Sequence, residues 1–325
     1  MDEFLKLFPG SIRREFERLA FDIKELEEVR IRVGQPVFIH YRGKEWAVCK
    51  SGELESYQPD HSYLSFSDSD IKKIIDYLCD FSVYSYEDEI KKGYLTVPGG
   101  HRIGLCGGAS MEGGQIKTLR YITYLNIRIA HEVKGVADPV MRYLFGSRHV
   151  HNTLIISPPG LGKTTLLRDI IRQASDGTHA NKGYKVALVD ERSEIAGCYH
   201  AIPQNDVGIR TDVLDGSLKA EGMLMLLRSM SPQIIAVDEI GGTNDVHALE
   251  EMIRSGCSMI ATVHADSMED LLKKEIFHSM MQKHFFTRFI LITGKCRMER
   301  QYQVYDEELR ELYHTPFRLV TDQCS

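Results

Sequence analysis

The sequence predicts an α/β protein with two domains, a smaller α+β domain over residues 1–147 and a domain built on a parallel-rich sheet over residues 148–325. Three observations support this fold class. The 325 residues correspond to about two domains at roughly 150 residues each. The first part carries short alternating strand patterns separated by turn signals. From about residue 150, continuous apolar runs alternate with helical stretches, which is typical of parallel strands covered on both faces.

The first half of the N-terminal domain is predicted to contain a short antiparallel meander, because three strand-like segments are separated by turn residues. These segments are VRIRVG at 29–34, PVFIHY at 36–41 and EWAVC at 45–49. After a polar loop, apolar residues recur at helical spacing within residues 67–79. We therefore expect an amphipathic helix there, with a second helix over residues 84–92.

The second half of the N-terminal domain is expected to form further antiparallel strands. YLTVP and HRIGLCGG flank a turn at Gly99 and Gly100, which predicts a hairpin. The pattern YITYLNIRIA predicts another strand over residues 121–130.

Four apolar runs define the predicted sheet of the C-terminal domain. They are TLIIS at 153–157, KVALVD at 185–190, QIIAVDE at 233–239 and SMIATVH at 258–264. A helix is expected near 267–283, followed by two more strands in FFTRFILITG and YQVYD. No internal repeat or low-complexity segment interrupts this order.

Composition excludes several classes of protein. The chain has 46 acidic and 40 basic residues, so it lacks the overall positive charge of a dedicated nucleic-acid binder. Its seven cysteines form no CxxC pair, which argues against a four-cysteine zinc site and a disulfide framework. No apolar run reaches the roughly 18 residues of a membrane span, and the charged N-terminus does not resemble a signal peptide. Membrane association is therefore expected to be peripheral or through a partner.

A glycine-rich segment between the TLIIS strand and an amphipathic helix predicts a phosphate-binding loop. Glycines at 160 and 162 let the backbone approach phosphate, and the following helix N-terminus supplies N–H groups. Lys163 is expected to reach the β- and γ-phosphates, and the Thr164 hydroxyl to bind Mg²⁺. The full pattern opens with glycine, whereas this chain has Ser157 there. The predicted nucleotide-binding residues are Pro158, Pro159, Gly160, Leu161, Gly162, Lys163, Thr164 and Thr165.

Two carboxylates close the apolar run QIIAVDE. Asp238 is placed to hold Mg²⁺ through water, together with Thr164. Glu239 is placed to polarise the attacking water, which phosphoryl transfer requires.

Polar residues also end two other predicted strands. Because the carboxyl ends of parallel strands meet at one edge of the sheet, VDERSE and ATVH should lie near the phosphate loop. Glu191 or Glu194 is expected to assist in placing metal or water. His264 is a candidate for sensing the γ-phosphate, although a lone histidine is more often structural.

Taken together, SPPGLGKTT, VDERSE, LLRSMSPQIIAVDEIGG and ATVHADS resemble, in this order, the hexameric secretion and pilus-motor ATPases. The resemblance implies a RecA-like P-loop NTPase domain after a smaller α+β domain. The acidic elements then correspond to the family's Asp box and Walker B motif, and ATVHADS to its His box. Many secretion ATPases have glycine at the position of Asp238, so the complete Asp-Glu pair favours hydrolysis. GGHRIGLCG, NIRIAHEVKG and PQNDVGIRTDVLDG narrow the resemblance to the sporulation stage III AA family.

The resemblance implies a magnesium-dependent ATPase of endospore-forming bacteria that assembles as a homo-hexamer. It would lie on the cytoplasmic side of the mother-cell membrane and energise a channel complex of membrane proteins. Such ATPases bring arginines of the N-terminal domain or of a neighbouring subunit to the γ-phosphate. The candidate arginines of this chain are Arg102, Arg128, Arg210 and Arg228.

Two other functions stay open on the sequence. Ring-shaped nucleic-acid motors share the phosphate loop, but the acidic net charge and the lack of an aromatic-basic cluster argue against one, so no nucleic-acid partner is expected. A nucleotide-gated scaffold would bind ATP and assemble a membrane complex with little turnover.

Overall fold

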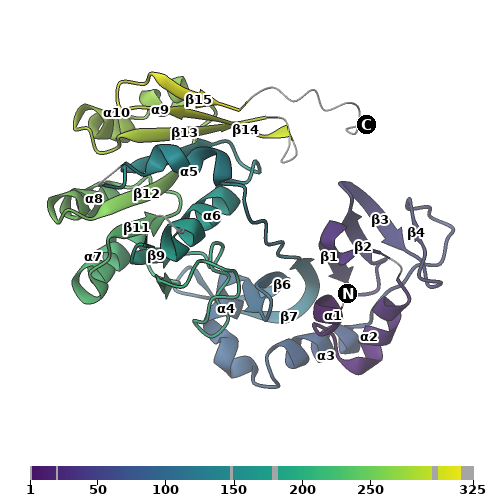
Figure 1. Cartoon of the computed structure of the whole chain (residues 1–325). Coiled ribbons are helices and arrows are strands. Elements are labelled where there is room, and N and C mark those ends of the chain that lie inside the picture. Colours follow the sequence, from purple (N-terminus) through teal and green to yellow (C-terminus); the bar gives the residue numbers. More distant parts are fainter. Residues whose placement is uncertain (1, 20, 147–148, 178–181, 295–298, 316–325) are drawn as a thin grey trace. The chain divides into compact units, whose positions relative to one another are not determined.

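The computed structural model describes residues 2–19, 21–146, 149–177, 182–294 and 299–315 (Figure 1). The chain divides into two compact units, Met1–His131 and Glu132–Ser325. This division lies earlier than the boundary at residue 147 that the sequence suggests. The difference arises because helix α5 (Asp138–Leu144) buries Val140 and Leu144 in the core of the second unit.

The first unit is built on a seven-stranded antiparallel sheet with the order β4-β3-β2-β1-β7-β6-β5. Its strands are β1 (Leu26–Arg32), β2 (Phe38–Tyr41), β3 (Lys44–Val48), β4 (Leu54–Glu55), β5 (Tyr94–Val97), β6 (His101–Glu112) and β7 (Gln115–Arg128). The predicted meander and the predicted hairpin are confirmed as β1–β2–β3 and β5–β6. The strand predicted over 121–130 begins earlier, because β7 continues along the whole length of β6.

Short helices accompany this sheet. They are α1 (Asp2–Leu5), α2 (Gly10–Glu17), α3 (Asp68–Leu78) and α4 (Glu87–Lys92), with 3-10 turns at Ile23–Glu25 and Val83–Tyr86. Ser67 begins α3 with a capping box in which its side chain accepts from the Asp70 N–H. The ring of Phe16 stacks on that of Phe8 and meets the edge of Phe4, so α1 and α2 share one aromatic cluster.

The second unit contains an eight-stranded sheet with the order β10-β9-β11-β12-β8-β13-β14-β15. Its strands are β8 (Thr153–Ser157), β9 (Val186–Asp190), β10 (Thr211–Asp215), β11 (Ile234–Val237), β12 (Ser258–His264), β13 (Arg288–Thr293), β14 (Gln301–Tyr305) and β15 (Glu311–His314). The strands from β10 to β13 run parallel, and β14 and β15 are antiparallel additions at one edge. The predicted α/β class with a parallel-rich sheet is confirmed.

Helices cover both faces of this sheet (Figure 1). One face packs against α5 and α6 (Lys163–Asp176), which bury Leu166, Ile170 and their neighbours. The other face packs against α7 (Lys219–Met230), α8 (Thr243–Arg254), α9 (Met268–Lys273) and α10 (Glu275–Gln282). Burial on both faces explains why the central strands have no alternating pattern.

Three features of this unit differ from the sequence-based prediction. Strands β10 and β15 were not expected, because TDVLD and ELYH are the two partly exposed edge strands of the sheet and have no apolar run. The single helix expected near 267–283 is two helices, since Lys274 adopts an extended conformation between α9 and α10.

Among the described residues, none of the helices is long and apolar enough to cross a bilayer.

Candidate functional site

The loop between β8 and α6 has the backbone conformation of an anion-binding turn. Gly160 and Gly162 adopt positive φ values of 84° and 91°, which favour glycine. The Leu166 N–H donates to the Gly162 carbonyl at 2.9 Å at the start of α6. The N–H groups of Lys163 and Thr164 precede this bond, so the helical ladder does not use them. They are available to a negatively charged group at the helix N-terminus.

The Lys163 side chain extends from this loop toward the ends of two neighbouring strands, and it is only 5% exposed. Its Nζ lies 3.3 Å from Glu239 Oε1 and 3.6 Å from Asp238 Oδ1, both directly after β11. The same Nζ lies 3.2 Å from His264 Nε2 at the end of β12. The amine therefore lies among the polar ends of adjacent parallel strands, where the sequence placed the site.

Thr262, buried within β12, connects the two carboxylates. Its hydroxyl accepts a hydrogen bond from the Glu239 N–H at 2.9 Å and donates to Asp238 Oδ1. The other oxygen of Asp238 accepts from the Thr164 hydroxyl at 3.2 Å. These oxygens suit Mg²⁺, which is usually held by one or two protein oxygens, phosphates and water. Residues Thr164 and Asp238 therefore fit the metal role expected from the sequence.

Glu239 is the most highly connected acidic group of the site. Its Oε1 lies 2.6 Å from His264 Nε2, and its Oε2 lies 3.1 Å from Arg192 Nη1. Because a carboxylate only accepts, His264 Nε2 carries the proton and donates. Burial opposes ionisation of Glu239, but Lys163, His264 and Arg192 together hold its pKa below the usual range. Glu239 is therefore an ionised carboxylate at neutral pH.

The turn after β9 is organised by a buried acid, Asp190, which was not among the predicted site residues. Asp190 is 2% exposed and accepts hydrogen bonds from three successive N–H groups, those of Glu194, Ile195 and Ala196. Burial raises the pKa of Asp190 to about 6. Arg168 of α6 donates to the carbonyls of Glu194 and Ile195 at 2.7 and 2.5 Å. The acidic turn is thus joined directly to the helix that begins at the phosphate loop.

The family model for sporulation stage III, protein AA, matches residues 1–312. The chain belongs to this family. It is 39% identical over 316 residues to stage III sporulation protein AA of Bacillus subtilis (strain 168), which covers 97% of this chain and 98% of that protein.

Solved secretion ATPases share the fold of this sporulation family member. The ATPase DotB of Legionella pneumophila superposes with a TM-score of 0.51 at 16% identity, over 88% of this chain and 78% of that one. The pilus retraction motor PilT with bound ADP superposes with a TM-score of 0.55 at 13% identity, over 91% of this chain and 82% of that one. The second unit of this family member therefore has the RecA-like P-loop fold of the secretion ATPases.

Two of the remaining predicted residues, Glu191 and Arg210, contact groups outside the phosphate loop. Glu191 pairs with Lys219 of α7 at 2.7 Å and not with Lys163. Arg210 donates to the carbonyls of Ser175 and Asp176 at 2.9 and 3.2 Å. These carbonyls end α6, which begins at the loop and is about 20 Å long.

Arg228 lies in the last turn of α7 and is exposed. Strand β11 starts shortly afterwards. Arg228 therefore lies near the end of the sheet where the parallel strands begin, whereas Asp238 lies at the end where they finish.

In the first unit, Arg102 and Arg128 are cross-strand neighbours on β6 and β7. The guanidinium of Arg102 lies 3.7 Å from the ring centroid of Tyr94, which is a cation–π contact. Nε of Arg128 lies 3.9 Å from Glu28 Oε2. Both arginines lie on the sheet face opposite the buried residues Ile103 and Ile127.

Arg192, the residue between Glu191 and Ser193 in VDERSE, was not among the predicted site residues. The two glutamates of this segment were the candidates, because carboxylates are the usual metal and water ligands. An arginine directly after a strand-end carboxylate was the available signal. Its contact with Glu239 depends on β9 and β11 being neighbours, which single motifs do not reveal.

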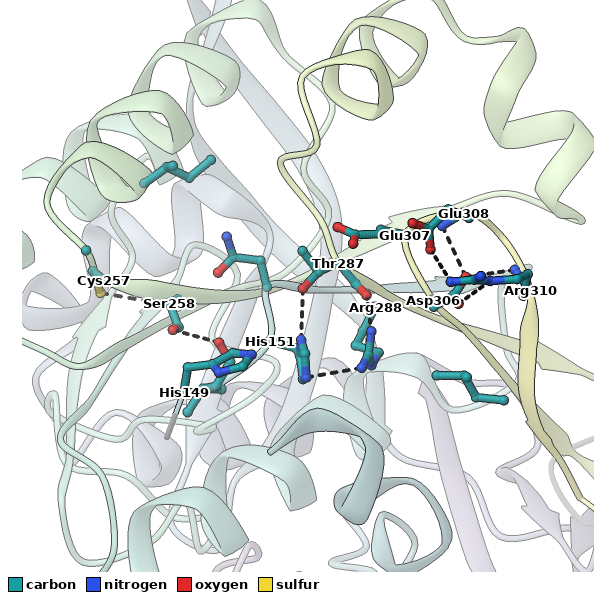
Figure 2. Close-up of a pocket in the computed structure, with 15 residues that line it drawn as sticks. His149, His151, Cys257, Ser258, Thr287, Arg288, Asp306, Glu307, Glu308 and Arg310 are labelled. Atoms are coloured by element: carbon teal, nitrogen blue, oxygen red, sulfur yellow. Dashed lines mark hydrogen bonds and ion pairs between the residues drawn. The ribbon is translucent and has the colours of Figure 1, made fainter. Parts of the chain in front are cut away.

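A cavity of about 540 Å³ lies at the opposite end of the strands from the phosphate loop, where β8, β12 and β13 begin (Figure 2). His151 contacts Thr287 at 3.1 Å and Arg288 at 3.1 Å there. Burial, Arg288 and His149 lower the pKa of His151 to about 4, so its ring is neutral. Arg288 and Arg310 are both engaged in hydrogen bonds with neighbouring residues. Because the phosphate loop follows the end of β8, this cavity at the start of β8 is separate from it.

Proposed function

We propose that this protein hydrolyses ATP with Mg²⁺ and works as a secretion-ATPase-like ring that energises a channel complex during endospore formation. The observation that carries the proposal is the position of Lys163 Nζ, 3.3 Å from Glu239 Oε1 in a glycine-rich loop at the start of α6. A cation that can bind phosphate and an ionised carboxylate that can orient water thus face each other at the carboxyl ends of the parallel strands.

Each side chain of the site has a defined part in the proposed reaction. Lys163 and the N–H groups of the loop bind the β- and γ-phosphates. Glu239 accepts a hydrogen bond from the attacking water and orients it toward the γ-phosphate. His264 and Arg192 hold the two oxygens of Glu239 and keep it ionised. Thr164 and Asp238 would hold Mg²⁺, which would neutralise charge on the phosphates.

The contact between Lys163 and Glu239 suggests how binding prepares hydrolysis. When the amine turns to phosphate, it leaves a carboxylate that still has its other partners, His264 and Arg192. Glu239 then has capacity to accept from water. Nucleotide binding and activation of the base are coupled through one lysine.

The assembly proposed for this ATPase is a homo-hexamer at the cytoplasmic side of the mother-cell membrane, docked on membrane proteins of the channel complex. The support is membership of the sporulation family and the fold shared with secretion ATPases. In such a ring a neighbour supplies an arginine to the γ-phosphate, for which Arg102, Arg128, Arg210 and Arg228 are the candidates. Glu191 stays a candidate for placing water or metal.

The direct test is phosphate release by the purified full chain with ATP, in Mg²⁺ and in excess chelator. Turnover that requires Mg²⁺ and is unaffected by single-stranded DNA supports the proposal. Stimulation by DNA would instead indicate a nucleic-acid motor. Tight ATP binding without turnover, in the presence of the co-purified membrane proteins from sporulating cells, would indicate a nucleotide-gated scaffold.

A further inference from the structure

Arg300, the residue that precedes β14, lies beside the phosphate loop. Strand β13 pairs in parallel with β8, with Leu291 opposite Ile156. It also pairs with β14, with Thr293 opposite Gln301. Arg300 immediately precedes Gln301. It therefore lies at the end of the sheet where β8 finishes and the phosphate loop begins.

The guanidinium of Arg300 rests against Gly162. A Cβ atom added to Gly162 would lie only 2.6 Å from Arg300 Nη1, which is closer than such atoms approach. A side chain at position 162 would therefore displace the end of this arginine, and the positive φ of 91° would strain the backbone. The same Cβ would lie 4.0 Å from the Thr165 Cβ, so Arg300 and Thr165 lie on one side of this glycine.

Lys163 and Arg300 approach the loop from opposite directions. The partners of Lys163 lie at the ends of β11 and β12, on one side of β8 in the sheet. Arg300 precedes β14, which lies beyond β13 on the other side. Within the part of the chain that the structure describes, no acidic side chain pairs with Arg300. Its charge therefore adds to the positive end of α6 instead of being neutralised.

We propose that Arg300 binds the α-phosphate end of a nucleotide held in the phosphate loop of its own subunit. This inference rests on the proposed nucleotide site. Lys163 takes the β- and γ-phosphates, and the phosphate next to the nucleoside lies toward Thr165 and Arg300. A guanidinium suits this place because it can donate two parallel hydrogen bonds to phosphate oxygens.

The position of Arg300 determines which kinetic constants it affects. The α-phosphate is common to ADP and ATP, and its bonds do not change when the γ-phosphate is transferred. Binding it stabilises the ground state and the transition state equally, which lowers KM and leaves kcat unchanged. Arg300 therefore differs from an arginine that contacts the γ-phosphate, which acts on kcat.

The experiment is a calorimetric titration of the full chain with ADP and with a non-hydrolysable ATP analogue. Arg300→Ala should weaken both affinities by the same factor, about tenfold or more, as expected for losing a charged hydrogen bond. Arg300→Lys should fall between this variant and the wild type. Arg310→Ala is the matched control and should bind as the wild type does, because Arg310 bonds to Asp306 near the opposite sheet edge.

The outcomes separate this inference from the proposed function. Wild-type protein that binds neither nucleotide would contradict the proposed function itself. Wild-type binding with unchanged ADP affinity in Arg300→Ala would overturn the role of Arg300, and so would a loss confined to the ATP analogue. Mixing Arg300→Ala with Lys163→Ala subunits should give no recovery of activity at low ATP, because both residues serve the same subunit. Recovery would mean that Arg300 acts on a neighbour.

Discussion

Arg192 Nη1 lies 3.1 Å from Glu239 Oε2, so the turn after β9 supplies a cation to the acidic residue that follows β11. The other oxygen of Glu239 contacts Lys163 and His264. A single carboxylate thus joins the ends of β9, β11 and β12 to the phosphate loop. Glu239 also has a positive φ of 56°, a backbone conformation that non-glycine residues rarely adopt and that often marks functional sites.

Arg192→Ala should move the acid limb of the kcat profile to higher pH. Arg192 helps to lower the pKa of Glu239, so its removal raises that pKa. As the pH falls, the carboxylate of the variant then becomes protonated at a higher pH than that of the wild type. Phosphate release measured across a pH series tests this, with Arg192→Lys expected to restore part of the shift. An unshifted acid limb would show that Arg192 does not influence the pKa of Glu239. Arg254→Ala, at an exposed pair with Glu251, is the control.

Glu239→Gln should bind ATP normally and hydrolyse it about 10²–10⁴ times more slowly, because the amide keeps the shape but cannot act as a base. Phosphate release and ATP affinity are measured on the same preparation. Glu250→Gln, which alters an ion pair with Lys283, should leave turnover unchanged. If turnover survived in Glu239→Gln, Glu191 or Glu194 would have to position the water.

Lys163→Ala should lose tight ATP binding, with an affinity at least about a hundredfold lower, since the amine makes more than one charged hydrogen bond to phosphate. Calorimetric titration with ATP provides the measurement, and Lys283→Ala is the surface control. Near-normal affinity of the Lys163→Ala variant would contradict the assignment of the phosphate loop.

Asp190 should stabilise the fold more at low pH than at neutral pH. Its pKa is raised from 3.8 to about 6 in the folded protein. Its contribution to the free energy of unfolding is therefore fully present below pH 3.8 and is lost as the pH rises through 6. This shift of about two units corresponds to roughly 3 kcal/mol. The difference in unfolding free energy between wild type and Asp190→Ala, from urea titrations, should therefore shrink between pH 4 and pH 7. Asp212→Ala is an exposed control, and a difference that grew with pH would refute the prediction.

Active sites completed between subunits should be rescued by mixing inactive variants. Lys163→Ala is combined with alanine variants of Arg102, Arg128, Arg210 or Arg228, one at a time. Some interfaces then pair an intact loop with an intact arginine, and activity should rise above both parents, because such an arginine is worth roughly 10³–10⁵ in rate. A protein that stayed monomeric with ATP, or the absence of rescue for every arginine, would refute a shared site.

The sequence was informative where chemistry and local pattern coincide. The loop with Lys163 lies between a buried strand and an amphipathic helix, and Asp238 and Glu239 directly end an apolar run, so motif and topology together predicted their meeting. Strand β10 was not predicted because TDVLD carries two aspartates at a sheet edge and has no apolar run.

The long-range contacts of the positively charged side chains of the site could not be predicted from the sequence. Arg192 reaches Glu239 only because β9 and β11 are paired, and Arg300 reaches Gly162 only because β14 folds back beside β13. Because an arginine side chain is long and flexible, the sequence pattern around it does not indicate which residue it contacts. The role of Asp190 was hidden for a similar reason, because its partners are backbone N–H groups, which every residue possesses.

Helix α6 connects three parts of the second unit. Its first residue, Lys163, belongs to the phosphate loop, Arg168 at mid-length holds the turn that carries Arg192, and its last carbonyls receive Arg210. Because a helix of this length is stiff, we expect a displacement at the loop to reach both the turn that carries Arg192 and Arg210, which directly precedes β10.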